Sequence, residues 1–244
     1  FKFSDKLVVI GRDMKNWLLR FYPDAENKVY YIPVWQDADL IKPHDFQKNP
    51  FVKKHDLQDK FVIQYSGNMG LWNDMETIGK GVNNLSEDVV FTFIGNGMRK
   101  KELLEVIEND FLQNVLFFPF LSNSDYSFAV TACHVGLVTL KKGLEGMAVP
   151  SKIIGIMAAG IPVVAVVPSE SEIAYILEEE SCGIVVEPGD DKAFVNALKV
   201  LKENPNMRQR MGENGRVAFQ RNYTTPIVAY KYLSLINNSN KSLI

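Results

Sequence analysis

The sequence is poor in the residues on which several common functions depend. Of its 244 residues, two are cysteines and three are histidines. Cys133 and Cys182 stand apart in apolar runs, which favours buried thiols in a reducing compartment over a disulfide framework. The histidines, His44, His55 and His134, have no metal-ligand spacing with one another or with the cysteines, so we predict no metal site.

Long apolar runs and an excess of charge are also missing. No stretch reaches the roughly 18 consecutive apolar residues that a membrane-spanning helix needs. The formal net charge is −2, so we expect no broad basic face and no nucleic acid partner. Any anion site must therefore be local. The chain also shows no nucleophile–histidine–acid set and no carboxylate pair for general acid–base catalysis.

What the sequence does have is a regular alternation of apolar runs and amphipathic segments, with an apolar content of 46% that is sufficient for a real core. From Pro33 to Asp59 the chain is polar, contains three prolines and is expected to be a linker or an extended segment. The alternation predicts an α/β fold with a Rossmann-like open parallel sheet and helices on both faces. We expect strands at 5–10, 29–32, 61–66, 89–94, 115–118, 135–140, 163–167 and 183–186. We expect helices at 12–21, 74–85, 99–108, 122–132, 153–159, 171–177, 191–203, 207–222 and 225–236.

The stretch from Ala148 to Val167 organises this pattern. Ser151 is a good N-cap for a short apolar helix, a Gly-Ile-Pro sequence ends that helix, and a β-branched run then predicts a strand buried on both faces. Ser151 and Lys152 lie at the positive end of the helix, a combination that suits a phosphate. The alternative interpretation is that Lys152 is a solvated lysine of the first turn.

Four loops rich in glycine and polar residues follow four of these strands. They cover residues 67–70, 95–97, 141–152 and 169–172. In an open parallel sheet the carboxyl ends of the strands meet at one edge, where ligands bind. We therefore expect these loops to share one rim.

Each loop offers groups that suit a sugar bound to a polyanion. The turns with Gly67, Asn68 and Gly70, and with Gly95 and Gly97, could expose N–H groups to phosphate, or could be plain connections. Glu145 could accept hydrogen bonds from sugar hydroxyls or could be a solvated loop charge. Glu170 and Glu172 could bind a ribose diol, although capping of the following helix is the better explanation for one of the two. Phe118 and Phe120 could enclose a base, and core packing is their alternative role.

As a set, these motifs resemble the carboxyl-terminal, nucleotide-sugar-binding half of a family 4 (group 1) glycosyltransferase of GT-B fold. The matching pieces are YSGNMG, FTFIGNG, NVLFFPF, VPSKIIGIMAAGIPVVA and CGIVVEPGD. The resemblance is strongest to the branch that builds cell-surface polysaccharides in bacteria. It implies a domain division into residues 1–35, a remnant of the amino-terminal acceptor domain; 36–59, an interdomain crossover; 60–236, the nucleotide-sugar-binding domain; and a tail at 237–244.

The resemblance implies a hexosyltransferase-type enzyme that transfers a sugar, with retention, from a nucleoside diphosphate sugar such as a UDP-sugar. The donor is a substrate, and no metal or other cofactor is required. The acceptor is a glycan or a lipid-linked molecule. Residues 67–70 and Lys152 would hold the diphosphate, Phe118 to Phe120 would border the base, and the loop of Glu145 would reach the donor sugar. The facing amino-terminal domain would be a missing partner, and the expected location is the cytoplasm, compatible with peripheral association with the membrane's inner face.

The sequence departs from the family pattern at two places. The family's ribose-binding glutamate would align with Gly155, so ribose binding would pass to Glu170 or Glu172. The arginine usual in the first phosphate turn is replaced by Leu71 and Trp72, which leaves Lys152 as the main cation. Two rival functions are a GT-B-like sugar-nucleotide epimerase, disfavoured by the scarcity of histidine, and a non-catalytic nucleotide-sugar-binding module.

Overall fold

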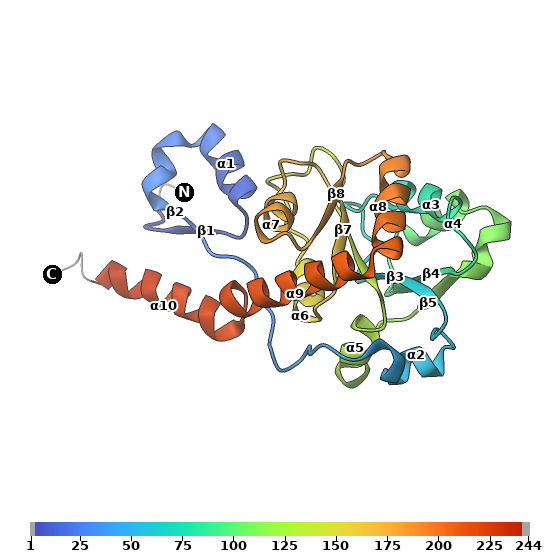
Figure 1. Cartoon of the computed structure of the whole chain (residues 1–244). Helices are drawn as coiled ribbons and strands as arrows, with labels where there is room; N and C mark the ends of the chain where they lie inside the picture. Colours follow the sequence, from blue (N-terminus) through green and yellow to red (C-terminus); the bar gives the residue numbers. More distant parts are fainter. Residues whose placement is uncertain (1–2, 241–244) are drawn as a thin grey trace.

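The computed structural model describes residues 3–240, and its strands form two parallel sheets (Figure 1). The small sheet pairs β1 (Leu7–Val9) with β2 (Val29–Tyr31). Between them the chain forms α1 (Arg12–Phe21) and a 3-10 helix (Pro23–Lys28). This strand–helix–strand piece lies beside the larger unit that contains the rest of the sheet structure.

The large sheet has six parallel strands in the order β5-β4-β3-β6-β7-β8. They are β3 (Phe61–Ser66), β4 (Val89–Ile94), β5 (Val115–Phe118), β6 (Val135–Thr139), β7 (Val163–Val166) and β8 (Gly183–Val186). The predicted Rossmann-like α/β fold is confirmed. The β-branched run after Pro162 is the buried strand β7, because every residue of that strand is fully inaccessible to solvent.

Helices cover both faces of the large sheet, and each face has its own apolar core. One face is covered by α3 (Met75–Val82), α4 (Lys100–Val106) and α8 (Asp191–Glu203). The other is covered by α2 (Pro50–Lys54), α5 (Asn123–Val130), α6 (Lys152–Ala158), α7 (Glu172–Glu180) and α9 (Pro205–Asn222). A 3-10 helix (Asn109–Asn114) precedes β5.

The prediction that residues 33–59 form a linker is wrong for the second half of that range. Phe46–Lys48 form a 3-10 helix and α2 follows, with Ile41, Val52 and Leu57 buried in the core of the large unit. The Asn49 side chain accepts the Phe51 N–H at 2.8 Å and donates to the Phe128 carbonyl at 2.8 Å. The buried apolar residues of this range do not recur at the spacing of a helix or a strand, so the sequence shows no periodic pattern there.

The carboxyl-terminal helix also differs from expectation. α10 spans Thr225–Asn240, so the predicted tail from residue 237 is helical to Asn240, and its remaining residues, 241–244, lie outside the described part. Figure 1 shows α9 and α10 running in succession from the large unit toward the small sheet. Within residues 3–240, no helix has the length and apolarity to cross a lipid bilayer. Cys133 and Cys182 are free, buried thiols, as expected.

Candidate functional site

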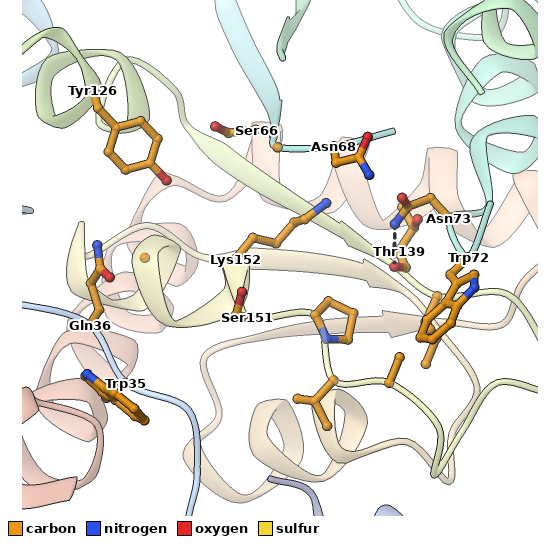
Figure 2. A pocket seen from close by; sticks show the side chains of 16 residues that line it. Trp35, Gln36, Ser66, Asn68, Trp72, Asn73, Tyr126, Thr139, Ser151 and Lys152 are labelled. Atoms are coloured by element: carbon orange, nitrogen blue, oxygen red, sulfur yellow. Dashed lines mark hydrogen bonds between the residues drawn. The ribbon is translucent and has the colours of Figure 1, made fainter. Parts of the chain in front are cut away.

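A cleft of about 550 Å³ lies at the carboxyl ends of β3 and β6 (Figure 2). These strands are neighbours in the sheet, and the chain continues from β3 toward one edge and from β6 toward the other. That is the topological switch point at which open α/β sheets bind ligands. Its lining residues are Trp35, Gln36, Ser66, Gly67, Asn68, Trp72, Asn73, Tyr126, Thr139, Leu140, Ala148, Val149, Pro150, Ser151, Lys152 and Gly155.

Lys152 is the first residue of α6, and its half-buried side chain brings an amine into the cleft. Its Nζ lies 3.7 Å from the centroid of the Tyr65 ring, and Figure 2 shows it directed toward Asn68. Burial lowers the pKa of Lys152 to about 7 from the ordinary 10.5. Within residues 3–240 no carboxylate forms an ion pair with this amine. The ring of Tyr65 is thus its main support, and a cation over an aromatic face is attracted by the ring quadrupole.

Tyr65 fixes the lysine and the glycine turn together. Its ring is fully buried under the amine, and its hydroxyl donates to the Asn68 carbonyl at 2.8 Å. Gly67 has φ +129°, and a Cβ at this position would lie 3.4 Å from Lys152 Cε and 3.6 Å from Nζ. The glycine therefore lets the backbone turn sharply at the end of β3 and come against the lysine chain.

The expected free N–H groups of this turn are largely occupied by the protein itself. Gly67 N donates to the Ile94 carbonyl, Met69 N to that of Asn96, and Gly70 N to the Asn73 side chain. The turn of residues 67–70 thus provides space and the Asn68 side chain. The positive charge of the cleft comes from Lys152, since of the described residues that line it, this one alone has a charged side chain.

Gly95 and Gly97 support the first turn from behind and do not line the cleft. A Cβ on Gly95 would lie 2.3 Å from the Gly67 carbonyl oxygen, and one on Gly97 would lie 2.3 Å from that of Met69. Both glycines are needed because two turns pack backbone to backbone. Their expected role in binding phosphate stays a prediction, and the contact shown here is structural.

The turn is also tied to β6. Asn73 Nδ2 donates to the Thr139 carbonyl at 3.2 Å, the bond drawn in Figure 2, and Thr139 Oγ1 accepts from Asp74 N at 3.0 Å. Trp72, directly before these two anchors in the chain, keeps half of its side chain exposed at the cleft. The two strand ends that frame the cleft are thereby held at a fixed separation.

The opposite end of the cleft is neutral and polar. Figure 2 shows the hydroxyl of Tyr126 directed toward the cleft, and the side chain of Gln36 lies at the same end. Burial raises the pKa of Tyr126, and a hydrogen bond with Ser66 opposes that rise. Gly155 leaves space there, since its Cβ would meet only Ile41 Cδ1 at 3.4 Å and the Tyr126 hydroxyl at 3.8 Å. The cleft therefore runs from a cationic end to a hydroxyl-and-amide end.

Ser151 lines the cleft and stands at the N-cap position of α6, as predicted, but its side chain makes no capping hydrogen bond, because its own backbone is already helical. The three candidate glutamates do not line the cleft. Glu145 accepts the Gly143 N–H at 2.8 Å within its loop. Glu170 is exposed outside the cleft lining. Glu172 is 1% exposed and accepts hydrogen bonds from Arg12 and Tyr31, so its oxygens are occupied.

The two predicted base-binding aromatics are separated by the structure. Phe118 packs against Phe51 and His55 of the α2 region and lines a different hollow, of about 290 Å³. Phe120 is 64% exposed and lies near Gly95, where a Cβ would be 3.2 Å from its ring. Phe118 has the core-packing role that was its alternative, while Phe120 remains on the strand-end side of the sheet.

The sequence reasoning missed most of the neutral residues of the cleft. Ser66 and Thr139 could have been found, because each ends a strand whose carboxyl end was expected at the rim. Trp35, Gln36 and Tyr126 come from the crossover and from α5, and no local signal marks them. Chemically, the arrangement suits binding of an anion attached to a neutral polar group.

Comparisons with known proteins show what the chain as a whole is similar to. Residues 46–218 match the family described as glycosyl transferases group 1. Over 234 residues the chain is 30% identical to the "Probable glycosyltransferase WbjE" of Pseudomonas aeruginosa, covering 96% of this chain and 58% of that protein. Over 199 residues it is 27% identical to the "Putative colanic acid biosynthesis glycosyl transferase WcaI" of Escherichia coli, covering 80% and 49%. The chain thus spans about half the length of the curated relatives it matches.

Solved structures share the fold at low sequence identity. Alr3699/HepE of Anabaena, crystallised with UDP, has a TM-score of 0.85 and 14% identity, over 97% of this chain and 65% of that one. The sucrose-phosphate synthase of Thermosynechococcus elongatus has a TM-score of 0.78 and 18% identity, over 98% and 59%. At such identities these likenesses establish the architecture.

Proposed function

Since this chain belongs to the group 1 glycosyl transferases, we propose that it binds the nucleoside diphosphate sugar donor of a glycosyltransferase. The expected donor is a UDP-sugar. The observation that carries the proposal is the Lys152 amine, which lies 3.7 Å from the centroid of the Tyr65 ring at the sheet's switch point and has no carboxylate partner in the described residues. A desolvated ammonium without a counter-ion is costly to keep, so an anionic ligand is its natural partner.

The shape of the cleft supports the same ligand class. A volume of about 550 Å³ is in the range of small-molecule sites. In the proposal the diphosphate lies against Lys152 and Asn68, and a neutral hydroxylated part of the donor extends toward Tyr126 and Gln36. The structural neighbour Alr3699/HepE was crystallised with UDP and with UDP-glucose, which favours UDP as the first nucleotide to test.

The proposed chemistry is transfer with retention, in which the bond between the sugar and the diphosphate breaks. Negative charge then grows on the leaving diphosphate, and the Lys152 ammonium, 3.7 Å above an aromatic ring, is placed to stabilise it. In this proposal the donor is a substrate and no metal is required. Glu145 would contact the donor sugar only after its bond to Gly143 N is released.

The whole protein's acceptor is a further part of the proposal. WcaI is described as acting in colanic acid biosynthesis, and WbjE as a glycosyltransferase. We therefore expect a glycan or lipid-linked acceptor in cell-surface polysaccharide assembly. Residues 1–35 would belong to the acceptor domain, 36–59 would be the crossover, and 60–236 would bind the donor.

The test is calorimetric titration of UDP and UDP-glucose into the wild type and Lys152→Ala. We expect binding to the wild type and a loss of about tenfold or more in the variant, because a charge-assisted contact is removed. Lys142→Ala, an exposed lysine of the neighbouring loop, is the control and should bind normally. Equal affinity in wild type and Lys152→Ala would remove Lys152 from the site. Donor binding without transfer in a full-length protein would favour the non-catalytic alternative.

A further inference from the structure

The amino-terminal helix α1 packs directly on the loop of residues 141–150 (hereafter the cleft loop). This loop supplies Ala148, Val149 and Pro150 to the wall of the cleft, just before Lys152. α1 lies outside the residues that match the family, and Figure 1 shows it beside α7 of the large unit. The contact therefore joins the small sheet to the cleft wall.

One buried carboxylate makes the central bond of this contact. Asp13, 5% exposed, accepts the Gly146 N–H on Oδ2 at 3.0 Å and the Met14 N–H on Oδ1 at 2.7 Å. Both oxygens are thus used, one within α1 and one on the cleft loop. A hydrogen bond to a charged acceptor is stronger than one between neutral groups, and its loss leaves a buried N–H without a partner.

The packing around this bond leaves no room for side chains. A Cβ on Gly11 would lie 2.8 Å from Val149 Cγ2 and 2.3 Å from Asp13 Oδ1. Gly146 has φ +78°, and a Cβ there would lie 2.5 Å from Trp17 Cβ. Two glycines therefore allow the helix start and the cleft loop to meet closely, and Val149 is shared between this contact and the cleft.

A second set of bonds fixes α1 to the large unit at the same place. Glu172, the first residue of α7, accepts the Arg12 N–H at 2.6 Å and the Tyr31 hydroxyl at 2.7 Å. Arg12 Nε also pairs with Glu172 at 3.0 Å. Burial raises the pKa of Tyr31, and the Glu172 carboxylate adds to the rise. Burial alone would lower the pKa of Arg12, but its bonds and charge pairing with Glu172 and Glu179 raise it. α1 is therefore held against α7, and Asp13 cannot move away independently.

We propose that Asp13 is a positioning residue that holds the cleft loop in place, so that the amino-terminal strand–helix–strand piece sets the donor affinity of the cleft. The inference rests on the proposed donor-binding function. Without the Asp13 bond, the Gly146 N–H has no acceptor and the cleft loop gains conformational freedom. Ligand binding must then order Val149 and Pro150, and this loss of conformational entropy weakens the affinity.

The test compares Asp13→Asn, Asp13→Ala and the control Glu179→Gln. Asparagine keeps the size of the Asp13 side chain but has only one acceptor oxygen for the N–H groups of Met14 and Gly146. Glu179 is a suitable control because it pairs with Arg12 on the exposed side of the same contact. Two readouts are measured: the hydrogen exchange of amides 143–149 and the dissociation constant for UDP. Thermal unfolding shows which variants are folded.

We expect Asp13→Asn to raise the UDP dissociation constant by about fivefold and Asp13→Ala by about tenfold, with exchange of the loop amides accelerated to a similar degree. Glu179→Gln should match the wild type in both readouts. Should Asp13→Ala not fold, Asp13→Asn decides the question. Two results for the Asp13 variants would overturn the positioning role: faster exchange of the loop amides with unchanged UDP affinity, or exchange of the loop amides as slow as in the wild type. Failure of the wild type to bind UDP would instead refute the proposed function, and the exchange rates would still show whether Asp13 holds the loop.

Discussion

The affinity of the cleft for UDP should fall as the pH rises above 7, because one buried amine provides its positive charge. Burial holds the pKa of Lys152 at about 7, so the free protein loses this proton close to neutral pH. A bound diphosphate favours the charged form and restores the proton. The terminal phosphate of UDP, with a pKa of about 6, is already ionised in this range and does not offset the loss.

The size of the effect follows from the fraction of protein that carries the charge. If only the protonated form binds, the apparent dissociation constant is the intrinsic one divided by that fraction. With a pKa of about 7, the fraction is about one half at pH 7 and about one thirtieth at pH 8.5. UDP should therefore bind about 15-fold more weakly at pH 8.5 than at pH 7.

The assay is calorimetric titration at the two pH values, each in two buffers with different heats of ionisation. The buffer dependence of the enthalpy gives the protons taken up on binding, which should approach one per UDP at pH 8.5. Lys152→Arg is the matched variant, because its guanidinium stays charged and should remove the pH dependence. Affinity that is constant from pH 7 to 8.5 in the wild type, without proton uptake, would refute the reasoning.

Three further predictions concern stability and are measured by urea unfolding. Lys152→Met should raise the free energy of unfolding at pH 7 by about 1–3 kcal/mol. The pKa of Lys152 is about 7 in the folded protein and 10.5 ordinarily, so folding disfavours the charged amine, and this cost is greatest at and below pH 7. The wild type should lose up to about 3 kcal/mol as the pH falls from 6.5 toward 4, where burial holds the pKa of His134 at about 4. His134→Asn, which can still accept the Val62 N–H, should flatten this loss. Gly97→Ala should destabilise by about 2 kcal/mol or more and Gly143→Ala by about 1 kcal/mol, since both have positive φ but the first alone meets backbone. Equal losses at the two glycines would contradict the role given to turn packing.

The strands and the position of the cleft could be predicted from the sequence. Apolar runs such as 61–66 and 163–167 mark buried strands, and parallel topology then brings their carboxyl ends together. Of the four loops expected at one rim, residues 67–70 and 141–152 do contribute to the cleft. Residues 95–97 lie behind the first turn, and 169–172 lie outside the lining. Topology fixes which edge a loop leaves from, but not the direction of its side chains.

The remaining features depend on contacts between distant residues. Glu172 was a candidate for ribose binding because it follows a strand end, yet its partner Arg12 lies 160 residues away in the chain. Tyr126 reaches the cleft because α5 packs over the same sheet face as α6. Neither relation has a local signature. The lysine was found from its place at a helix start, although its burial and its aromatic support required the fold.

The central claim is that this cleft receives a diphosphate at Lys152, and a crystal structure of the chain with UDP tests it most directly. The account predicts a phosphate oxygen about 2.7–3.0 Å from Lys152 Nζ, with the nucleoside extending toward Tyr126. UDP bound away from the switch point, or in the cleft with its diphosphate remote from Lys152, would contradict the account.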